Sequence, residues 1–259
     1  MTINIETRGR VQTLTLCRPQ ALNAFNDEMY KAIGDALSAA ALDDEISVVI
    51  ITGSGRAFSS GQDLGEMGDP KRREKGFVGQ FGYFIKTVAT FPKPLLAAVN
   101  GIGVGIGLTL LPHCDLVYMS SDARLRAPFA ALGVTVEAGN SYLLPKVLGW
   151  ANAADILFTG KWIDAATAKE IGLVFKVCKP DQLLDDVMAK ASEIAALPIV
   201  SLVTTKKLML QHREKGFVLA RSLEEKAFAK LIGAPANREA ITAFTEKREP
   251  DFSNLSGNS

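Results

Sequence analysis

The segment Leu95–Asp115, LLAAVNGIGVGIGLTLLPHCD, places a short apolar strand directly before glycines at every second position. Gly101, Gly103, Gly105 and Gly107 lack a Cβ atom, so their main-chain N–H groups can approach another segment closely. Such a stretch suits either an anion site at the start of a helix or the close packing of one backbone on another. The stretch by itself favours neither interpretation.

The apolar run Leu108–Leu111 predicts the opening turns of a buried helix, whose exposed N–H groups would favour developing negative charge. A membrane span would need roughly 20 apolar residues. Asn100, Pro112 and Asp115 interrupt or close the run before that length. The spacing also fails the G-x-G-x-x-G fingerprint of dinucleotide-binding proteins.

The composition indicates one globular domain with a helical appendage: 259 residues, 47% of them hydrophobic, with a formal net charge of +1. This balance, with no basic stripe, argues against nucleic acid or a membrane surface as a partner and favours a small molecule.

Three cysteines, Cys17, Cys114 and Cys178, are odd in number and widely spaced. They predict buried reduced thiols, because a disulfide framework or a metal cluster would group them differently. Residues 1–10 contain no apolar signal core. We therefore expect a cytoplasmic protein.

The first half of the chain alternates predicted strands and helices. Ile3–Thr7 and Val11–Cys17 have the period-two pattern of a hairpin around Gly9, and Asn26 can cap a helix. The β-branched run Val48–Thr52 predicts a strand that is buried on both faces.

Residues 57–64 then read as a polar loop, and the charged run Lys71–Lys75 as a solvated face or lid before a helix through Phe84. Leu116–Met119 is a further strand. This alternation implies an α/β fold with parallel crossovers.

The second half is mainly helical. The predicted helices, with one short strand at Val174–Cys178, are Tyr142–Leu148, Ala151–Phe158, Ala165–Ile171, Leu183–Leu197, Val200–Gln211, Phe217–Ile232 and Arg238–Lys247.

Five ordered motifs resemble those of the crotonase, or enoyl-CoA hydratase/isomerase, superfamily and span nearly the whole chain. They are RPQALNAF at 18–25, AFSSGQDL at 57–64, KPLLAAVNGIGVGIG at 93–107, CDLVYMSSDARLRAPFAALG at 114–133 and FTEKREPDF at 244–252.

The resemblance implies an α/β crotonase-like fold: a spiral of ββα units over residues 1–197 and a helical trimerisation region over 198–259. It also implies an acyl-CoA thioester as ligand and a homotrimer or dimer of trimers. Coenzyme A would arrive as part of the substrate, so no separate cofactor and no metal is expected.

Members of the superfamily polarise the thioester carbonyl with two backbone N–H groups. By resemblance these would be the amides of Ser60 and Ile106, with Gly105 as the alternative to the latter. The hydroxyls of Ser59 and Ser60 are expected to be incidental. The residues expected to contact substrate are Ala21, Gln62, Asp63, Leu64, Gly105, Thr109, Phe129, Phe244 and Lys247.

Within this set, Gln62 and Asp63 could hold the loop that takes the adenine, although a turn-stabilising role fits Asp63 equally. The resemblance places Phe244 beside the adenine, and it allows Lys247 and Arg18 to meet the CoA phosphates. His113 is expected to be structural.

Hydratases of the superfamily use two glutamates, and these positions fall at Thr109 and Phe129. One carboxylate, Glu137, stands between Val136 and Ala138. Its position resembles the one at which the single-acid isomerases of the superfamily carry a Glu or Asp. A glutamate that merely stabilises a helix start is the simpler explanation of that residue alone.

With the motifs, the residues predict a Δ3,Δ2-enoyl-CoA isomerase in which Glu137 moves a proton from C2 to C4. Apolar surroundings should raise the proton affinity of this carboxylate. Two alternatives stay open: a non-catalytic acyl-CoA-binding protein, and a hydratase with relocated acid and base groups.

Overall fold

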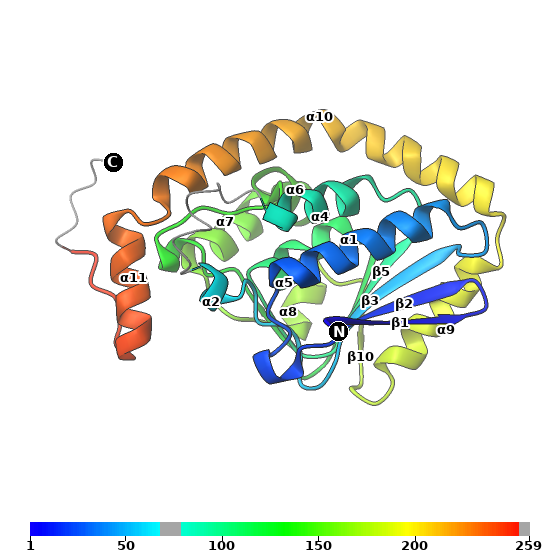
Figure 1. The fold of residues 1–259 in the computed structure, drawn as a ribbon, viewed down its shortest axis with the longest axis horizontal. Helices are drawn as coiled ribbons and strands as arrows, with labels where there is room; N and C mark the ends of the chain where they lie inside the picture. The colour runs from blue at the N-terminus through cyan, green and yellow to red at the C-terminus, as the bar shows by residue number, and fades with distance from the viewer. Residues whose placement is uncertain (68–78, 254–259) are drawn as a thin grey trace.

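A six-stranded sheet with the order β1-β2-β3-β5-β7-β10 forms the centre of the molecule (Figure 1). The structure is a computed structural model that describes residues 1–67 and 79–253, so the predicted lid at Lys71–Lys75 lies outside the described residues. The strands are β1 Ile3–Arg8, β2 Val11–Leu16, β3 Val48–Gly53, β5 Leu95–Val99, β7 Leu116–Ser120 and β10 Lys176–Cys178.

The predicted hairpin is confirmed, since β1 and β2 pair antiparallel, and the pairs from β2 onward are parallel, as the alternation of strands and helices predicts. Both faces of β3 are buried: Val49 and Ile51 join the larger core cluster, and Val48 and Ile50 join the smaller one. Helix α1 (Asp27–Leu42), which Asn26 caps, covers the first face, and α9 (Leu183–Ala195) covers the second.

A second sheet has four strands in the order β4-β6-β8-β9. Its first strand lies within residues 57–64, which we predicted to be a loop, so that prediction is wrong for the first three of these residues. Its strands are β4 Ala57–Ser59, β6 Ile102–Val104, β8 Arg124–Arg126 and β9 Ile163–Asp164. The residues that lead into β4 and β6 approach so closely that a Cβ atom on Gly101 would lie 2.2 Å from the Arg56 carbonyl oxygen. Gly101 therefore serves the close packing of two backbones, and so does Gly107, where a Cβ atom would lie 2.8 Å from the Ser59 carbonyl oxygen.

The predicted helix at Leu108–Leu111 is wrong in its bounds. Helix α5 spans only Ile106–Thr109, and a 3-10 turn, η2, follows at Leu111–His113. Pro112 has no N–H group with which to continue the helical ladder, which accounts for the early end. The short α5 places the Ile106 N–H at a helix start.

Helix α10 (Ile199–Leu231) is one continuous helix of 33 residues, so the two predicted helices Val200–Gln211 and Phe217–Ile232 are joined. A single glycine inside a helix costs only about 1 kcal/mol, and no other strong breaker stands between them. Gly216 also has a packing role: a Cβ atom there would lie 2.4 Å from the Tyr142 ring. Figure 1 shows α10 arching over α4 and α6.

The predicted helices at 142–148, 151–158, 165–171 and 238–247 correspond to α6, α7, α8 and α11, and α11 begins at a proline. The remaining helical elements of the described residues are η1 Pro19–Ala21, α2 Leu64–Met67, α4 Gly79–Thr90, η3 Ala130–Leu132, α6 Asn140–Leu148, α7 Trp150–Thr159, α8 Ala165–Glu170 and α11 Pro235–Glu246.

All three cysteines are free, with Cys178 buried and Cys17 and Cys114 partly buried. None of the helices in the described residues is by itself long and apolar enough to cross a membrane; α9 and α10 meet that test only as a pair bent by 103°.

An ion pair between a buried ammonium and a solvent-accessible carboxylate attaches α10 to the central sheet. The Lys206 ammonium, with a residue exposure of 5%, donates to Asp115 Oδ2 over 2.7 Å and to the Lys93 carbonyl over 2.7 Å. Asp115 Oδ2 also accepts the N–H of Leu95 at the start of β5. The carboxylate thus joins a strand and a helix that are far apart in sequence.

Replacing Asp115 with alanine should lower the free energy of unfolding by about 3 kcal/mol, because Lys206 would be left buried without its anion. Urea unfolding followed by circular dichroism measures the change. Glu193→Ala is the matched control, since its pair with Lys190 is exposed and should contribute under about 1 kcal/mol. Equal losses in the two variants would contradict this account.

Candidate active site

Three backbone segments meet beside the glycine-rich turn: residues 60–63 after β4, the start of α5, and the turn that precedes α6. Gly61 lies against the chain before α5, since a Cβ atom there would be 3.0 Å from the Val104 carbonyl oxygen. Thr109, at the end of α5, donates its hydroxyl to Glu137 Oε1 over 3.3 Å. The predicted carboxylate and the predicted amide donor at Ile106 are therefore brought to the same short helix.

The prediction that Ser60 supplies a backbone donor is wrong. Its N–H group is already donated to the Leu22 carbonyl oxygen at 2.9 Å. The Gly105 N–H is likewise donated to the Arg126 carbonyl oxygen at 3.0 Å, which excludes Gly105 as the alternative to Ile106. Ile106 is the first residue of α5, and an N–H group at that position has no acceptor within the helix.

Gln62 carries the available N–H group on the other segment. Phe25 and Gln62 form a parallel bridge in which Gly61 and Asp63, on either side of Gln62, make the hydrogen bonds to Phe25. Successive N–H groups of an extended chain point in opposite directions, so the Gln62 N–H faces away from Phe25. Among the described residues it has no hydrogen-bond acceptor.

The Gln62 side chain is held in place, since its Oε1 accepts the Tyr30 hydroxyl at 2.8 Å. Sequence reasoning included Gln62 as a substrate contact but missed its N–H group. The bridge to Phe25 could not be read from the motif AFSSGQDL alone.

The serine hydroxyls are structural, in agreement with expectation. Ser59 Oγ donates to the Asn23 carbonyl at 2.9 Å, and Ser60 Oγ donates to the Ala21 carbonyl at 3.1 Å. These bonds connect the loop after β4 to the turn around η1. Ala21 therefore contributes its carbonyl to the frame of the site.

Asp63 has a structural partner. Its carboxylate accepts from the Arg18 guanidinium at 2.8 Å and from the Gly65 N–H at 3.0 Å. Burial acts to raise the pKa of Asp63, but these hydrogen bonds outweigh it and hold the pKa below its usual range. The turn-stabilising role is thus realised, and Leu64 begins α2 directly after it.

Glu137 is a partly buried carboxylate in apolar surroundings. Burial raises its pKa from 4.5 to about 7, the Thr109 hydroxyl lowers it, and the negative charge of Glu224 adds to the rise. Thr109 and Phe129, which the resemblance matches to the two glutamates of hydratases, are themselves buried. A carboxyl with a pKa near neutrality can both accept and return a proton.

The turn that carries Glu137 has unusual backbone geometry. Ala138 has a φ of 62° and Gly139 a φ of 76°, two left-handed residues in succession. A non-glycine residue in this region is strained and persists where neighbouring contacts hold it. The Ala138 carbonyl lies 2.9 Å from His113 Nε2, and Asn140 Nδ2 donates to the Thr109 carbonyl over 2.8 Å.

His113 is buried beside this turn, and burial lowers its pKa to about 4. It is therefore neutral near pH 7, and its contact with Ala138 agrees with the structural role expected of it.

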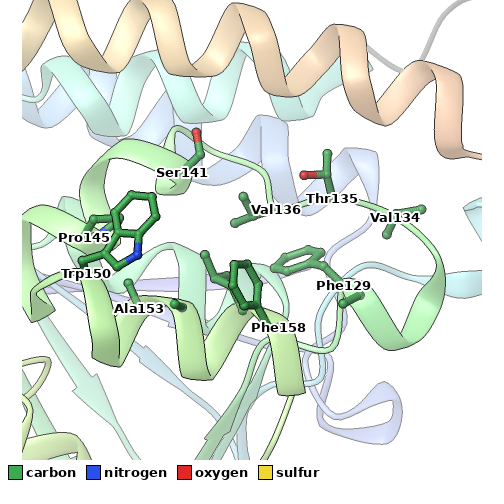
Figure 2. A pocket seen from close by; sticks show the side chains of 12 residues that line it. Phe129, Val134, Thr135, Val136, Ser141, Pro145, Trp150, Ala153 and Phe158 are labelled. Carbon is green, nitrogen blue, oxygen red and sulfur yellow. The ribbon is translucent and has the colours of Figure 1, made fainter.

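An apolar cavity of about 290 Å³ lies between α7 and the chain before Glu137 (Figure 2). Its lining includes Phe129 and Val136 on one side and Trp150 and Phe158 of α7 on the other. Glu137, Gln62 and Ile106 are not part of that lining. Phe129 thus lines this cavity, and Val136, the residue directly before Glu137, lines it as well.

Two predicted contacts lie elsewhere in the chain. Phe244, near the end of α11, is 67% exposed, and Lys247 follows the helix and is also exposed. Helix α11 packs on η3, where Asn237 Nδ2 donates to the Leu132 carbonyl at 2.7 Å. Among the described residues, no hydrogen bond or ion pair joins Phe244 or Lys247 to Ala21 or Asp63.

The parallel sheet, its crossover helices and the two adjoining loops that present free amides define an α/β protein of the crotonase fold. A profile of the family described as enoyl-CoA hydratase/isomerase matches residues 6–255. The crystal structure of an enoyl-CoA hydratase/isomerase from Pseudoalteromonas atlantica T6c superposes with a TM-score of 0.92 and 34% identity, covering 98% of this chain and 100% of that chain.

A probable enoyl-CoA hydratase from Rhizobium meliloti (strain 1021) is 34% identical over 251 residues, covering 97% of each chain. A 1,2-epoxyphenylacetyl-CoA isomerase from Escherichia coli (strain K12) is 32% identical over 248 residues, covering 93% of this chain and 94% of the relative. The chain belongs to the enoyl-CoA hydratase/isomerase family. In the part of the chain that the structure describes, no cluster of three or more potential metal ligands occurs.

Replacing Glu137 with glutamine should stabilise the fold at a pH well above about 7, the pKa in the folded protein. The folded state holds this proton more tightly than the unfolded state, so the wild type loses stability as pH rises from 4.5 through about 7. The expected gain is up to about 3 kcal/mol and vanishes in acid. Urea unfolding as a function of pH measures it.

The exposed Glu214→Gln is the control, and it should leave the pH dependence of stability unchanged. A Glu137→Gln gain that is the same at every pH would contradict the raised pKa.

Proposed function

We propose that this protein shifts the double bond of an unsaturated acyl-CoA, converting a 3-enoyl-CoA to a 2-enoyl-CoA. The observation that carries the proposal is the position of Glu137, a carboxylate with a pKa raised to about 7 and hydrogen-bonded to Thr109. Thr109 and Phe129 occupy the places of the two glutamates that hydratases use. A single acid suits proton transfer along the acyl chain.

In the proposed reaction, the Glu137 carboxylate removes a proton from C2, and the C–H electrons form a dienolate whose charge rests on the thioester oxygen. The N–H groups of Gln62 and Ile106 stabilise this oxygen. The Glu137 carboxylic acid then returns the proton at C4, and the double bond lies between C2 and C3. The carboxylate is regenerated, and atoms and charge balance without another reactant.

The two amides fit this role because each belongs to a rigid element and lacks an acceptor in the described structure. Preorganised donors stabilise a developing oxyanion without the cost of reorienting solvent. The Tyr30 hydroxyl and the bridge to Phe25 fix Gln62, and α5 fixes Ile106.

Hydration of a 2-enoyl-CoA is the second candidate, because a probable enoyl-CoA hydratase is among the relatives at 34% identity. It would require water to be activated by groups other than Thr109 and Phe129. A non-catalytic acyl-CoA-binding protein is the third, and it predicts binding without turnover.

As part of the same proposal, the chain acts in the cytoplasm without a separate cofactor, as a homotrimer or dimer of trimers. Phe244 and Lys247 contact the CoA moiety in this proposal. Their exposure is consistent with such a contact.

Glu137→Gln should abolish isomerisation of 3-enoyl-CoA, because the amide can neither remove nor return the proton. In the wild type, kcat/KM should rise with pH and level off above about 7, since the ionised carboxylate is the base. Conversion is followed by absorbance of the 2-enoyl thioester. Turnover at the wild-type rate would refute the proposal, and water addition to crotonyl-CoA that survives the substitution would favour the hydratase.

Gln62→Pro removes one backbone donor and should lower kcat on the order of 100- to 1,000-fold. Gln62→Ala keeps the N–H group while losing the bond to Tyr30, so its loss should be much smaller. Steady-state kinetics on the same substrate compares the two variants, with circular dichroism to confirm folding. Comparable losses in both would assign the effect to the side chain and contradict the amide role.

A further inference from the structure

Glu224 is a buried carboxylate on α10 that the proposed reaction does not use. Its residue exposure is 5%, whereas the neighbouring Glu225 is exposed and pairs with Arg221. A carboxylate is rarely buried unless its oxygens have partners. Both oxygens of Glu224 do.

The partners of Glu224 are two backbone N–H groups in the turn after Glu137. Oε2 accepts from Gly139 at 2.6 Å, and Oε1 accepts from Ser141 at 2.7 Å. These residues lie on either side of Asn140, the first residue of α6, and the N-cap of that helix is Gly139, which has no side chain to accept these N–H groups. A carboxylate from a distant helix therefore caps α6.

This contact acts on the strained part of the turn. Gly139 follows Ala138, the non-glycine residue with a φ of 62°. A Cβ atom on Gly139 would lie 2.3 Å from the Phe217 ring, which also belongs to α10. Helix α10 thus contacts the turn through a hydrogen-bonded carboxylate and a tightly packed ring.

We infer that Glu224 is a positioning residue for Glu137: by binding the N–H groups of Gly139 and Ser141, it fixes the turn that aims the catalytic carboxylate. The inference rests on the proposed function, since Glu137 must be the proton carrier. It gives helix α10 a role in the reaction that does not depend on contact with the substrate.

The electrostatic consequence follows from the groups around the two carboxylates. The groups facing Glu137 are the Thr109 hydroxyl and the Glu224 charge, and the latter raises the pKa of Glu137. Near Glu224, Arg221 donates to Glu225 and to the Gly82 carbonyl, and the buried His113 is neutral near pH 7. Removing the charge at 224 should therefore make Glu137 more acidic.

Two variants separate geometry from charge. Glu224→Gln removes the charge and leaves one of the two N–H groups facing an amide NH₂, so kcat should fall on the order of 100-fold with KM for the enoyl-CoA nearly unchanged. The acid limb of its pH–rate profile should move to lower pH. Glu224→Asp keeps the charge but is one methylene shorter, so kcat should fall while the acid limb stays in place.

Glu214→Gln is the matched control, because Glu214 is exposed on the same helix, and it should change neither kcat nor the pH profile. Wild-type kcat and an unmoved acid limb in Glu224→Gln would overturn the inference, as would a loss of kcat in that variant with the limb unmoved. Glu137→Gln, measured in parallel, distinguishes failure of the proposed function from failure of this inference. Activity in Glu137→Gln defeats the proposed function, whereas an inactive Glu137→Gln beside an unaffected Glu224→Gln defeats only this inference.

Amide hydrogen exchange of the wild-type protein supplies a measurement that does not depend on the variants folding. The N–H groups of Gly139 and Ser141 should exchange as slowly as those in the middle of α6, since a buried carboxylate holds them. Exchange at the rate of an exposed loop would overturn the inference.

Discussion

The close approach of β4 and the start of α5 is the constraint on which the site depends. A Cβ atom on Gly107 would lie 2.8 Å from the Ser59 carbonyl oxygen, so no other residue fits there without moving one of the two backbones. This approach places the chain after β4 beside the start of α5. The two proposed donors, the amides of Gln62 and Ile106, come from segments more than forty residues apart, and neither segment could form such a pair alone.

The placement of the Glu137 carboxylate, in contrast, costs stability. Burial that raises the pKa of Glu137 to about 7 also makes its ionised form unfavourable, and the φ of 62° at Ala138 adds backbone strain. Hydrogen bonds to His113, Asn140 and Glu224 offset these terms. A strained turn held from several sides is what accurate placement of a single acid requires.

Sequence reasoning recovered the features that rest on local pattern. The hairpin β1–β2, the buried strand β3 and the α/β class follow from the spacing of apolar residues, and the family follows from motifs that retain their order. It assigned a backbone donor to Ser60 and divided α10 into two helices. Both errors arose because the correct assignment depends on contacts between residues that are distant in sequence. The Leu22 carbonyl that occupies the Ser60 N–H, and the Tyr142 ring that packs on Gly216, are not neighbours in sequence.

The continuity of α10 has a mechanical consequence. One end of this helix is fixed to the sheet by Lys206 and Asp115, and Glu224, five turns further along, binds the turn of Glu137. A continuous helix transmits position along its axis, whereas two helices with a loop between them would not. Because Asp115 also accepts the Leu95 N–H at the start of β5, the strand that leads to the glycine-rich turn and the helix that holds the acid share one anchor. The proposed oxyanion donors and the proposed proton carrier are thus both positioned relative to the same point of the core.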